Sequence, residues 1–296
     1  MMRKISVFLL LVIMSLVTVA QTAYFTHQGL KRKYIVYTPK GYHQTKRYPV
    51  VFNFHDKGMT PAEQMLYTKL NQTADKYGFI VVYPKGVNED WNVGFGMSYR
   101  HGIDDIGFID ALLSHLQKDY LINPSKVFAT GLSRGGFFCH RLAAELSHRF
   151  AAVAPVGANL PDSVAMYHQG INNMAMLMIN GMVDEIVDYA GKEGSYYSAM
   201  GSYTYWKDRS FTNEMGRPAD TVFRKGEAVL VREASNSRIS ISLLTIEDSG
   251  HTWAGADDFN IGLPLGKTSR EIDLNEYIWA FFERHASKTL TTSIED

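Results

Sequence analysis

Short apolar runs alternate with amphipathic stretches along most of the chain. The runs predict strands, because each is short and carries few polar residues; they cover residues 32–39, 48–54, 79–83, 126–130, 150–156, 174–179 and 238–246. Apolar residues at helical spacing predict helices over 61–77, 104–119, from 137 onward and over about 274–284. Strands without polar alternation are typical of a mostly parallel central sheet with helices on both faces. The pattern therefore predicts an α/β fold.

The N-terminal segment has the pattern of a targeting signal. Arg3 and Lys4 precede an apolar run over residues 5–16, and residues 18–20 form a small-residue ending that suits signal peptidase. The run is too short to span a bilayer comfortably. We expect a signal peptide over residues 1–20, cut after Ala20, and a secreted or periplasmic chain that has no membrane association after cleavage.

The remaining residues, 21–296, contain no internal repeat, low-complexity tract or linker. We therefore expect a single catalytic domain, and we regard residues 189–226 as a candidate lid or insertion. The chain has 30 Lys and Arg against 30 Asp and Glu, so its balanced charge provides no broad field for nucleic acid or an anionic membrane. The expected partner is a small or neutral molecule.

Cysteine usage adds little to the chemistry. Cys139 is the single cysteine, so the chain forms no internal disulfide, and it has no C-x-x-C pattern of the kind that binds zinc. Cys139 falls on the predicted helix from residue 137, where a small apolar side chain packs against a sheet. We expect no metal and no cofactor.

The stretch FATGLSRGGFFCH, residues 128–140, joins a predicted strand to a predicted helix and places Ser133 between Gly131 and Gly135. The pattern G-x-S-x-G is common by chance, so its place in the predicted fold carries the argument. In a sharp strand-to-helix turn the serine hydroxyl is exposed at the end of the sheet, and the helix N-terminus attracts an anion. Ser133 is therefore the candidate nucleophile.

A serine hydroxyl needs a base that a carboxylate orients. In folds with this turn the chain order is serine, acid, histidine, each after a strand. Asp184 is the first carboxylate after the predicted strand 174–179, with Glu185 and Asp188 as alternatives, and His251 follows the predicted strand 238–246. We expect Asp184 as the acid and His251 as the base.

The transition state of acyl transfer also needs hydrogen-bond donors for its oxyanion. The backbone N–H after the nucleophile belongs to Arg134. The second donor is expected in the loop after residues 48–54, which reads His55, Asp56, Lys57, Gly58, and we assign it to the amide of Lys57. His55 is expected to order this loop.

Aromatic residues are frequent in the expected loops. Trp91, Phe95 and Tyr99 precede the predicted helix 104–119, and Trp253 lies two residues after His251. Aromatic faces suit sugar rings or a phenolic acyl group, although they also suit plain packing. Trp91 and Trp253 are the best placed to contact substrate.

Several longer stretches resemble the esterase family that unites polyhydroxybutyrate-depolymerase-type enzymes with secreted feruloyl and acetylxylan esterases. They are ADKYGFIVVYPKG (74–86), Trp91-Asn92, DDIGFIDALLSHLQKDYLINPSKVFATGLSRGG (104–136), FAAVAPV (150–156), NGMVDEIVDY (180–189) and GHTWAG (250–255). The resemblance covers most of residues 21–296. It implies an α/β-hydrolase fold, no metal, a Ser133, Asp184, His251 triad and hydrolysis of carboxylic esters.

The chain departs from the family pattern at three dipeptides. His55-Asp56 stands where relatives usually carry His-Gly, Asn180-Gly181 replaces a His-Gly before the acid, and Ser249-Gly250 replaces a glycine pair before the histidine. None of these changes removes a triad residue. The first falls in the loop that is expected to supply an oxyanion donor.

The combined features favour a secreted serine esterase that removes feruloyl or acetyl groups from plant polysaccharide. Within the enzyme class, the alternatives are a polyhydroxyalkanoate depolymerase and a peptidase on the same fold. From another class, the alternative is a non-catalytic carbohydrate-binding relative that kept the fold.

Overall fold

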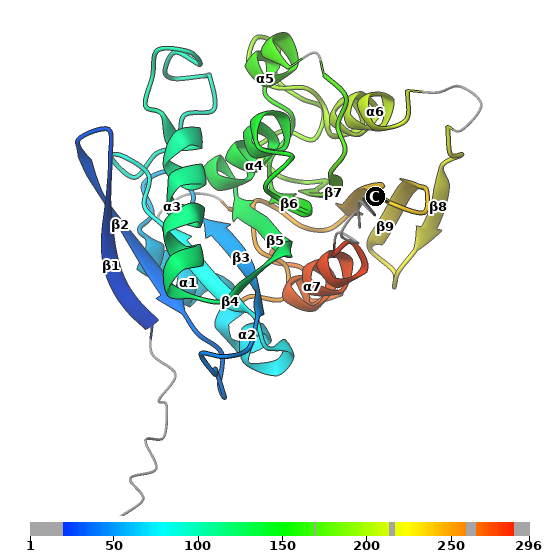
Figure 1. The fold of residues 1–296 in the computed structure, drawn as a ribbon. Coiled ribbons are helices and arrows are strands. Elements are labelled where there is room, and N and C mark those ends of the chain that lie inside the picture. The colour runs from blue at the N-terminus through cyan, green and yellow to red at the C-terminus, as the bar shows by residue number, and fades with distance from the viewer. Residues whose placement is uncertain (1–19, 169, 213–216, 259–264, 287–296) are drawn as a thin grey trace, which may run out of the picture.

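The structure is a computed structural model that describes residues 20–168, 170–212, 217–258 and 265–286 (Figure 1). Residues 1–19, which make up nearly all of the predicted signal peptide, lie outside the described residues. No helix in the described ranges has both the length and the apolar character that a membrane crossing requires.

A single 10-stranded sheet forms the centre of the fold, in the order β1-β2-β4-β3-β5-β6-β7-β10-β9-β8. The inner strands from β4 to β10 pair in parallel, whereas β1 and β2 at one edge and β9 and β8 at the other are antiparallel (Figure 1). The strands are β1 (Ala20–His27), β2 (Leu30–Tyr37), β3 (Tyr48–Phe54), β4 (Ile80–Pro84), β5 (Ile122–Leu132), β6 (Ala152–Val156), β7 (Ala175–Gly181), β8 (Thr221–Arg224), β9 (Val229–Ser235) and β10 (Ser240–Ile246).

Helices cover both faces of this sheet (Figure 1). One apolar cluster, which includes Phe138 and Trp206, joins one face to α3 (Asp105–Asp119), α4 (Arg134–Glu145), α5 (Asp162–Tyr167) and α6 (Ala199–Ser210). A second cluster, which includes Leu70 and Trp279, joins the other face to α1 (Pro61–Thr68), α2 (Leu70–Tyr77) and α7 (Leu274–Arg284). The predicted mostly parallel sheet with helices on both faces is therefore confirmed.

The helix predicted over 61–77 is in fact two helices. Lys69 has a left-handed backbone, with φ of 51°, and separates α1 from α2. At this break the carbonyl of Thr68 accepts a hydrogen bond from Asn275 Nδ2 at 2.7 Å, and the Thr68 hydroxyl accepts one from Asn53 Nδ2 at 3.0 Å. Side chains distant in sequence thus bind the end of α1, so periodicity alone could not reveal the break.

Part of the candidate lid, residues 189–226, belongs to the core. In α6 the side chains of Tyr203 and Trp206 are 1% and 0% exposed, and this helix packs on β7 and β10. The indole N–H of Trp206 donates to Nδ1 of buried His140 at 2.9 Å. Residues 213–216 of this segment lie outside the described residues.

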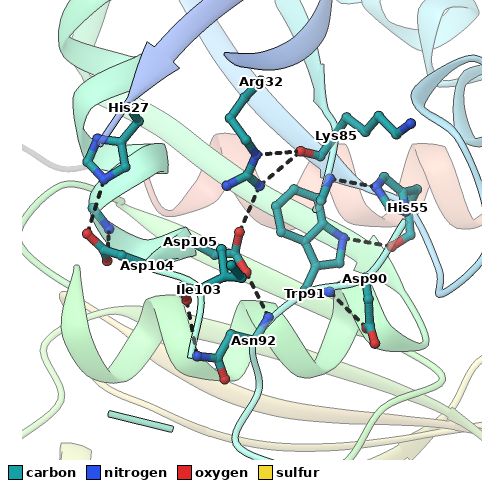
Figure 2. A network of polar contacts seen from close by, with 12 residues as sticks. His27, Arg32, His55, Lys85, Asp90, Trp91, Asn92, Ile103, Asp104 and Asp105 are labelled. Carbon is teal, nitrogen blue, oxygen red and sulfur yellow. Dashed lines mark hydrogen bonds and ion pairs between the residues drawn. The ribbon is translucent and has the colours of Figure 1, made fainter. Parts of the chain in front are cut away.

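A buried ion pair fixes the segment between β4 and α3 (Figure 2). Arg32 donates to Oδ1 of Asp105 at 2.7 Å and, through Nε and Nη2, to the carbonyl of Lys85. The other carboxylate oxygen of Asp105 accepts from the amide of Asn92, whose side chain in turn donates to the carbonyl of Ile103. These bonds hold Asn92 and the neighbouring Trp91 against the end of the sheet.

Candidate active site

Ser133 lies in a sharp turn between β5 and α4. Its φ of 53° and ψ of −115° are a strained conformation for a residue with a side chain. The turn is held on both sides, because the Ser133 amide donates to the carbonyl of Val156 at 2.8 Å and its carbonyl accepts from the amide of Phe137 at 2.8 Å. The side chain is consequently fixed at the carboxyl end of the parallel strands.

The glycines around Ser133 are required by close backbone contacts. A Cβ on Gly131 would lie 2.6 Å from a backbone atom of Gly135, and one on Gly135 would lie 2.3 Å from the carbonyl oxygen of Phe54. A Cβ on Gly136 would meet Ala158 and Val156 at 2.8 Å. The turn therefore lies against both neighbouring strands with no room for larger residues.

Asp184 and His251 form a buried hydrogen-bonded pair. Nδ1 of His251 lies 2.7 Å from Oδ2 of Asp184, and the two side chains are 1% and 2% exposed. The other oxygen, Oδ1, accepts from the amides of Ile186 and Val187 at 2.9 and 2.8 Å. Since Oδ2 accepts a hydrogen bond from the imidazole, the ring proton lies on Nδ1, and Nε2 is left as the basic nitrogen.

Of the carboxylates considered for the acid position, Asp184 is the one that contacts the histidine. Glu185 and Asp188 are both exposed, and Asp188 accepts a hydrogen bond from the amide of Ala190 at 2.8 Å. The loop after β7 therefore turns the first of its carboxylates inward and the other two toward solvent.

The imidazole of His251 lies beside the serine turn. A Cβ on Gly157 would lie 3.2 Å from Cε1 of His251 and 3.7 Å from a methyl carbon of Leu132. Gly157 directly follows Val156, which binds the Ser133 amide. Nε2 of His251 is buried and has no hydrogen-bond partner among the described residues. The basic nitrogen is thus free, next to the turn that carries Ser133.

The two amides expected as oxyanion donors converge on one atom. The Lys57 amide donates to Oδ1 of Asp56 at 2.6 Å, and the Arg134 amide donates to the same oxygen at 3.1 Å. The structure thus brings the loop after β3 and the first residue of α4 together. The acceptor between them is the side chain of Asp56, which sequence reasoning did not foresee. The signal was visible as the departure from His-Gly at His55-Asp56.

His55 orders the oxyanion loop from within the core. Its Nε2 accepts from the amide of Gly86 at 2.9 Å, so the proton lies on Nδ1, which donates to the carbonyl of Asp56 at 2.7 Å. Burial lowers the pKa of His55 to about 4, so the ring is neutral at pH 7. Its carbonyl accepts from the indole N–H of Trp91 at 3.0 Å (Figure 2).

The expectation that Trp91 and Trp253 contact substrate disagrees with their burial. Trp91 is 0% exposed and packs against Phe54 and Phe138. Trp253 is 1% exposed, and its indole N–H donates to Asn275 at 3.0 Å. Neither ring has a free face. The Trp91 indole binds the loop that carries Lys57, through the carbonyl of His55, and the Trp253 indole holds the loop that carries His251.

Half-buried Phe95 contacts the residue that follows the candidate nucleophile. The guanidinium of Arg134, the residue after Ser133, lies 4.5 Å from the Phe95 ring centroid, and Arg134 also pairs with Asp90 at 2.9 Å. Phe95 packs edge-on against Phe137 at 5.0 Å.

In the described ranges, no group of three or more His, Cys, Asp or Glu side chains is arranged to hold a metal ion.

Similarity to known proteins identifies the family of this chain. The family model described as "Putative esterase" matches residues 27–186. The chain belongs to this esterase family. The predicted family resemblance is therefore confirmed, and the matched residues include β3, β5 and the turns that carry Lys57 and Ser133.

Several relatives in sequence are named as esterases. The putative esterase NocK of Nocardia uniformis is 34% identical over 76% of this chain and 71% of its own length. A bifunctional acetylxylan esterase/xylanase of Neocallimastix patriciarum is 27% identical over 58% of this chain, and a probable feruloyl esterase C of Aspergillus clavatus is 27% identical over 55%. The chain spans only 24% and 58% of those last two proteins.

A solved structure supports the fold. The acetyl xylan esterase from Aspergillus awamori superposes with a TM-score of 0.57 at 16% identity, over 75% of this chain and 89% of that one. The likeness extends across most of both chains. The predicted α/β-hydrolase fold is confirmed.

Proposed function

We propose that this esterase-family protein is a serine carboxylic-ester hydrolase with Ser133 as nucleophile, His251 as base and Asp184 as the carboxylate that orients it. The observation that carries the proposal is the buried Asp184–His251 pair at 2.7 Å, whose free Nε2 belongs to a ring beside the strained serine turn. A buried imidazole nitrogen without a hydrogen bond is costly, so it favours a role with an incoming group.

The reaction proceeds by acyl transfer. Nε2 of His251 takes the proton from Ser133 as its oxygen attacks the ester carbonyl, and the amides of Lys57 and Arg134 donate to the resulting oxyanion. His251 then gives the proton to the departing alcohol, which leaves an acyl-serine. Water, deprotonated in the same way, releases the acid and restores the serine. Asp184 keeps the Nδ1 proton in place throughout.

The substrate class rests on the relatives. Proteins named feruloyl esterase and acetylxylan esterase share sequence with this chain over more than half of its length. Our proposal is that the enzyme removes feruloyl or acetyl groups from plant polysaccharide, as a single domain of residues 21–296 exported by a cleaved signal peptide. Its ester can be polysaccharide-linked or a small molecule.

The test compares purified protein from Gln21 onward with Ser133→Ala. Hydrolysis of 4-nitrophenyl acetate, methyl ferulate and a hydroxybutyrate oligomer is measured, together with labelling by a fluorophosphonate. Activity on the first two esters that disappears in Ser133→Ala is the expected result. A preference for the oligomer would replace the polysaccharide assignment. Absence of both turnover and label would refute the serine mechanism and favour a binding protein.

A further inference from the structure

We propose that Asp56 is an internal ligand of the oxyanion site, which the substrate must displace and which helps to expel the acid product. The inference rests on the proposed function and concerns the same site. Its basis is that Oδ1 of Asp56 accepts both candidate donor amides, Lys57 at 2.6 Å and Arg134 at 3.1 Å.

The geometry around Oδ1 is that of an occupied oxyanion site. Effective donors lie about 2.7–3.1 Å from the position of the oxyanion, and one oxygen receives both. The Arg134 amide also belongs to the first turn of α4, where the helix dipole favours negative charge. A carboxylate oxygen in this position resembles both the tetrahedral intermediate and the acid that the reaction releases.

The donor loop is held by contacts that do not need the carboxylate. His55 donates to the carbonyl of Asp56 and accepts from Gly86, and the Gly58 amide donates to the carbonyl of Glu89 at 2.8 Å. The indole of Trp91 binds the carbonyl of His55. Because these bonds fix the backbone, removal of the Asp56 side chain should leave the Lys57 and Arg134 amides in position and empty.

Neighbouring cations do not hold Asp56 in place. The side chains of Lys57 and Arg134 reach Asp90 instead, at 3.5 and 2.9 Å. Among the described residues, no ion pair involves Asp56. Asp56 is buried, with 7% of the residue exposed, and its side chain accepts hydrogen bonds from the two amides. Rotation about χ1 would free both amides without breaking a salt bridge.

An internal ligand competes with anything that uses the same donors. The apparent affinity of a substrate or product equals its intrinsic affinity multiplied by the fraction of molecules in which the site is open. This factor is the same for esters and acid products, and a product carboxylate is also repelled by the like charge of the displaced Asp56 side chain. Esters and acid products should therefore both bind more strongly once the side chain is removed.

The experiment compares the unmutated enzyme with Asp56→Gly and Asp56→Asn. We expect kcat/KM for 4-nitrophenyl acetate to rise, and the inhibition constant for acetate or ferulate to fall, by roughly tenfold or more in Asp56→Gly. Asp56→Asn keeps an acceptor oxygen without the charge, so smaller changes in the same directions are expected. Thermal unfolding checks that the variants fold. If Asp56→Gly does not fold, the kinetic constants of Asp56→Asn test the inference.

Asp90→Asn is the matched control. It removes a carboxylate that contacts the same two residues but leaves their amides bound to Asp56, so the inhibition constant of the product should change little. This inference alone is overturned if the enzyme is active and depends on Ser133, but kcat/KM and product inhibition are unchanged or weakened in both Asp56 variants. If every Asp56 form is inert and takes no fluorophosphonate label, the proposed function fails and this inference fails with it.

Discussion

Loss of the Arg32 side chain should destabilise the protein strongly. Arg32 and Asp105 are 4% and 1% exposed, and their charged atoms lie 2.7 Å apart. In Arg32→Met the buried carboxylate keeps the amide of Asn92 but loses its cation, and the carbonyl of Lys85 loses two donors. Breaking such a buried pair costs about 3–5 kcal/mol.

The assay is chemical and thermal unfolding followed by tryptophan fluorescence. A loss of this size should lower the unfolding temperature by about 10 °C, since each kcal/mol shifts a domain of this size by about 2–4 °C. Replacing both partners, in Arg32→Met with Asp105→Leu, should recover much of the loss because no unpaired charge then remains.

A surface arginine provides the comparison. Arg284 pairs with Glu233 at 3.3 Å while 54% exposed, so Arg284→Met should have a much smaller effect than Arg32→Met. Equal effects of the two substitutions would contradict the reasoning. So would a double variant no more stable than Arg32→Met, since the penalty would then not come from the unpaired carboxylate.

Other measurements test the core and the site. Burial lowers the pKa of His140 from 6.5 to about 4. The free energy of unfolding is therefore unaffected by His140 protonation above pH 6.5. It falls by about 3 kcal/mol in total as the pH drops toward 4, because the unfolded chain then binds the proton more readily. His140→Gln should flatten this part of the stability profile, and coincident profiles would exclude the explanation. Asp184→Asn should lower kcat by about 10⁴-fold through the wrong imidazole tautomer while methyl ferulate still binds, and a loss under tenfold would argue against its role. Gly135→Ala places a Cβ 2.3 Å from the carbonyl of Phe54, so we expect the esterase activity to be lost together with a lower unfolding temperature.

Much of the candidate site could be read from the sequence because parallel strands end at one edge. Asp184 is the first carboxylate after one apolar run and His251 follows the end of another, and the pairing of β7 with β10 brings those two ends together. The assignment of Ser133 depends only on the local turn between a strand and a helix. These inferences depend on where each strand ends along the chain and on the local turn, and the apolar runs show where the strands end.

Other features depend on contacts that a linear pattern does not record. Periodicity could not predict the break at Lys69, because the end of α1 binds Asn53 and Asn275. The edge strands β1 and β8, and β9 next to β8, are more exposed than the inner strands and lack a continuous apolar run. Trp91 is expected at the substrate, but its indole is buried and binds the carbonyl of His55. The type of a residue does not reveal which way its side chain faces.

Among the described residues β10 is the last strand, and it lies between β7 and β9. His251 follows it, 67 residues after its partner Asp184. A ribosome delivers the chain from the N-terminus, so the serine turn and the acid loop are synthesised well before the imidazole that joins them. A nascent or truncated chain that ends before β10 would also expose the edge of β7, which favours aggregation. For a protein exported as we propose, the pair that would activate the serine can form only after β10 and His251 have been synthesised, so ester hydrolysis would begin only after that point.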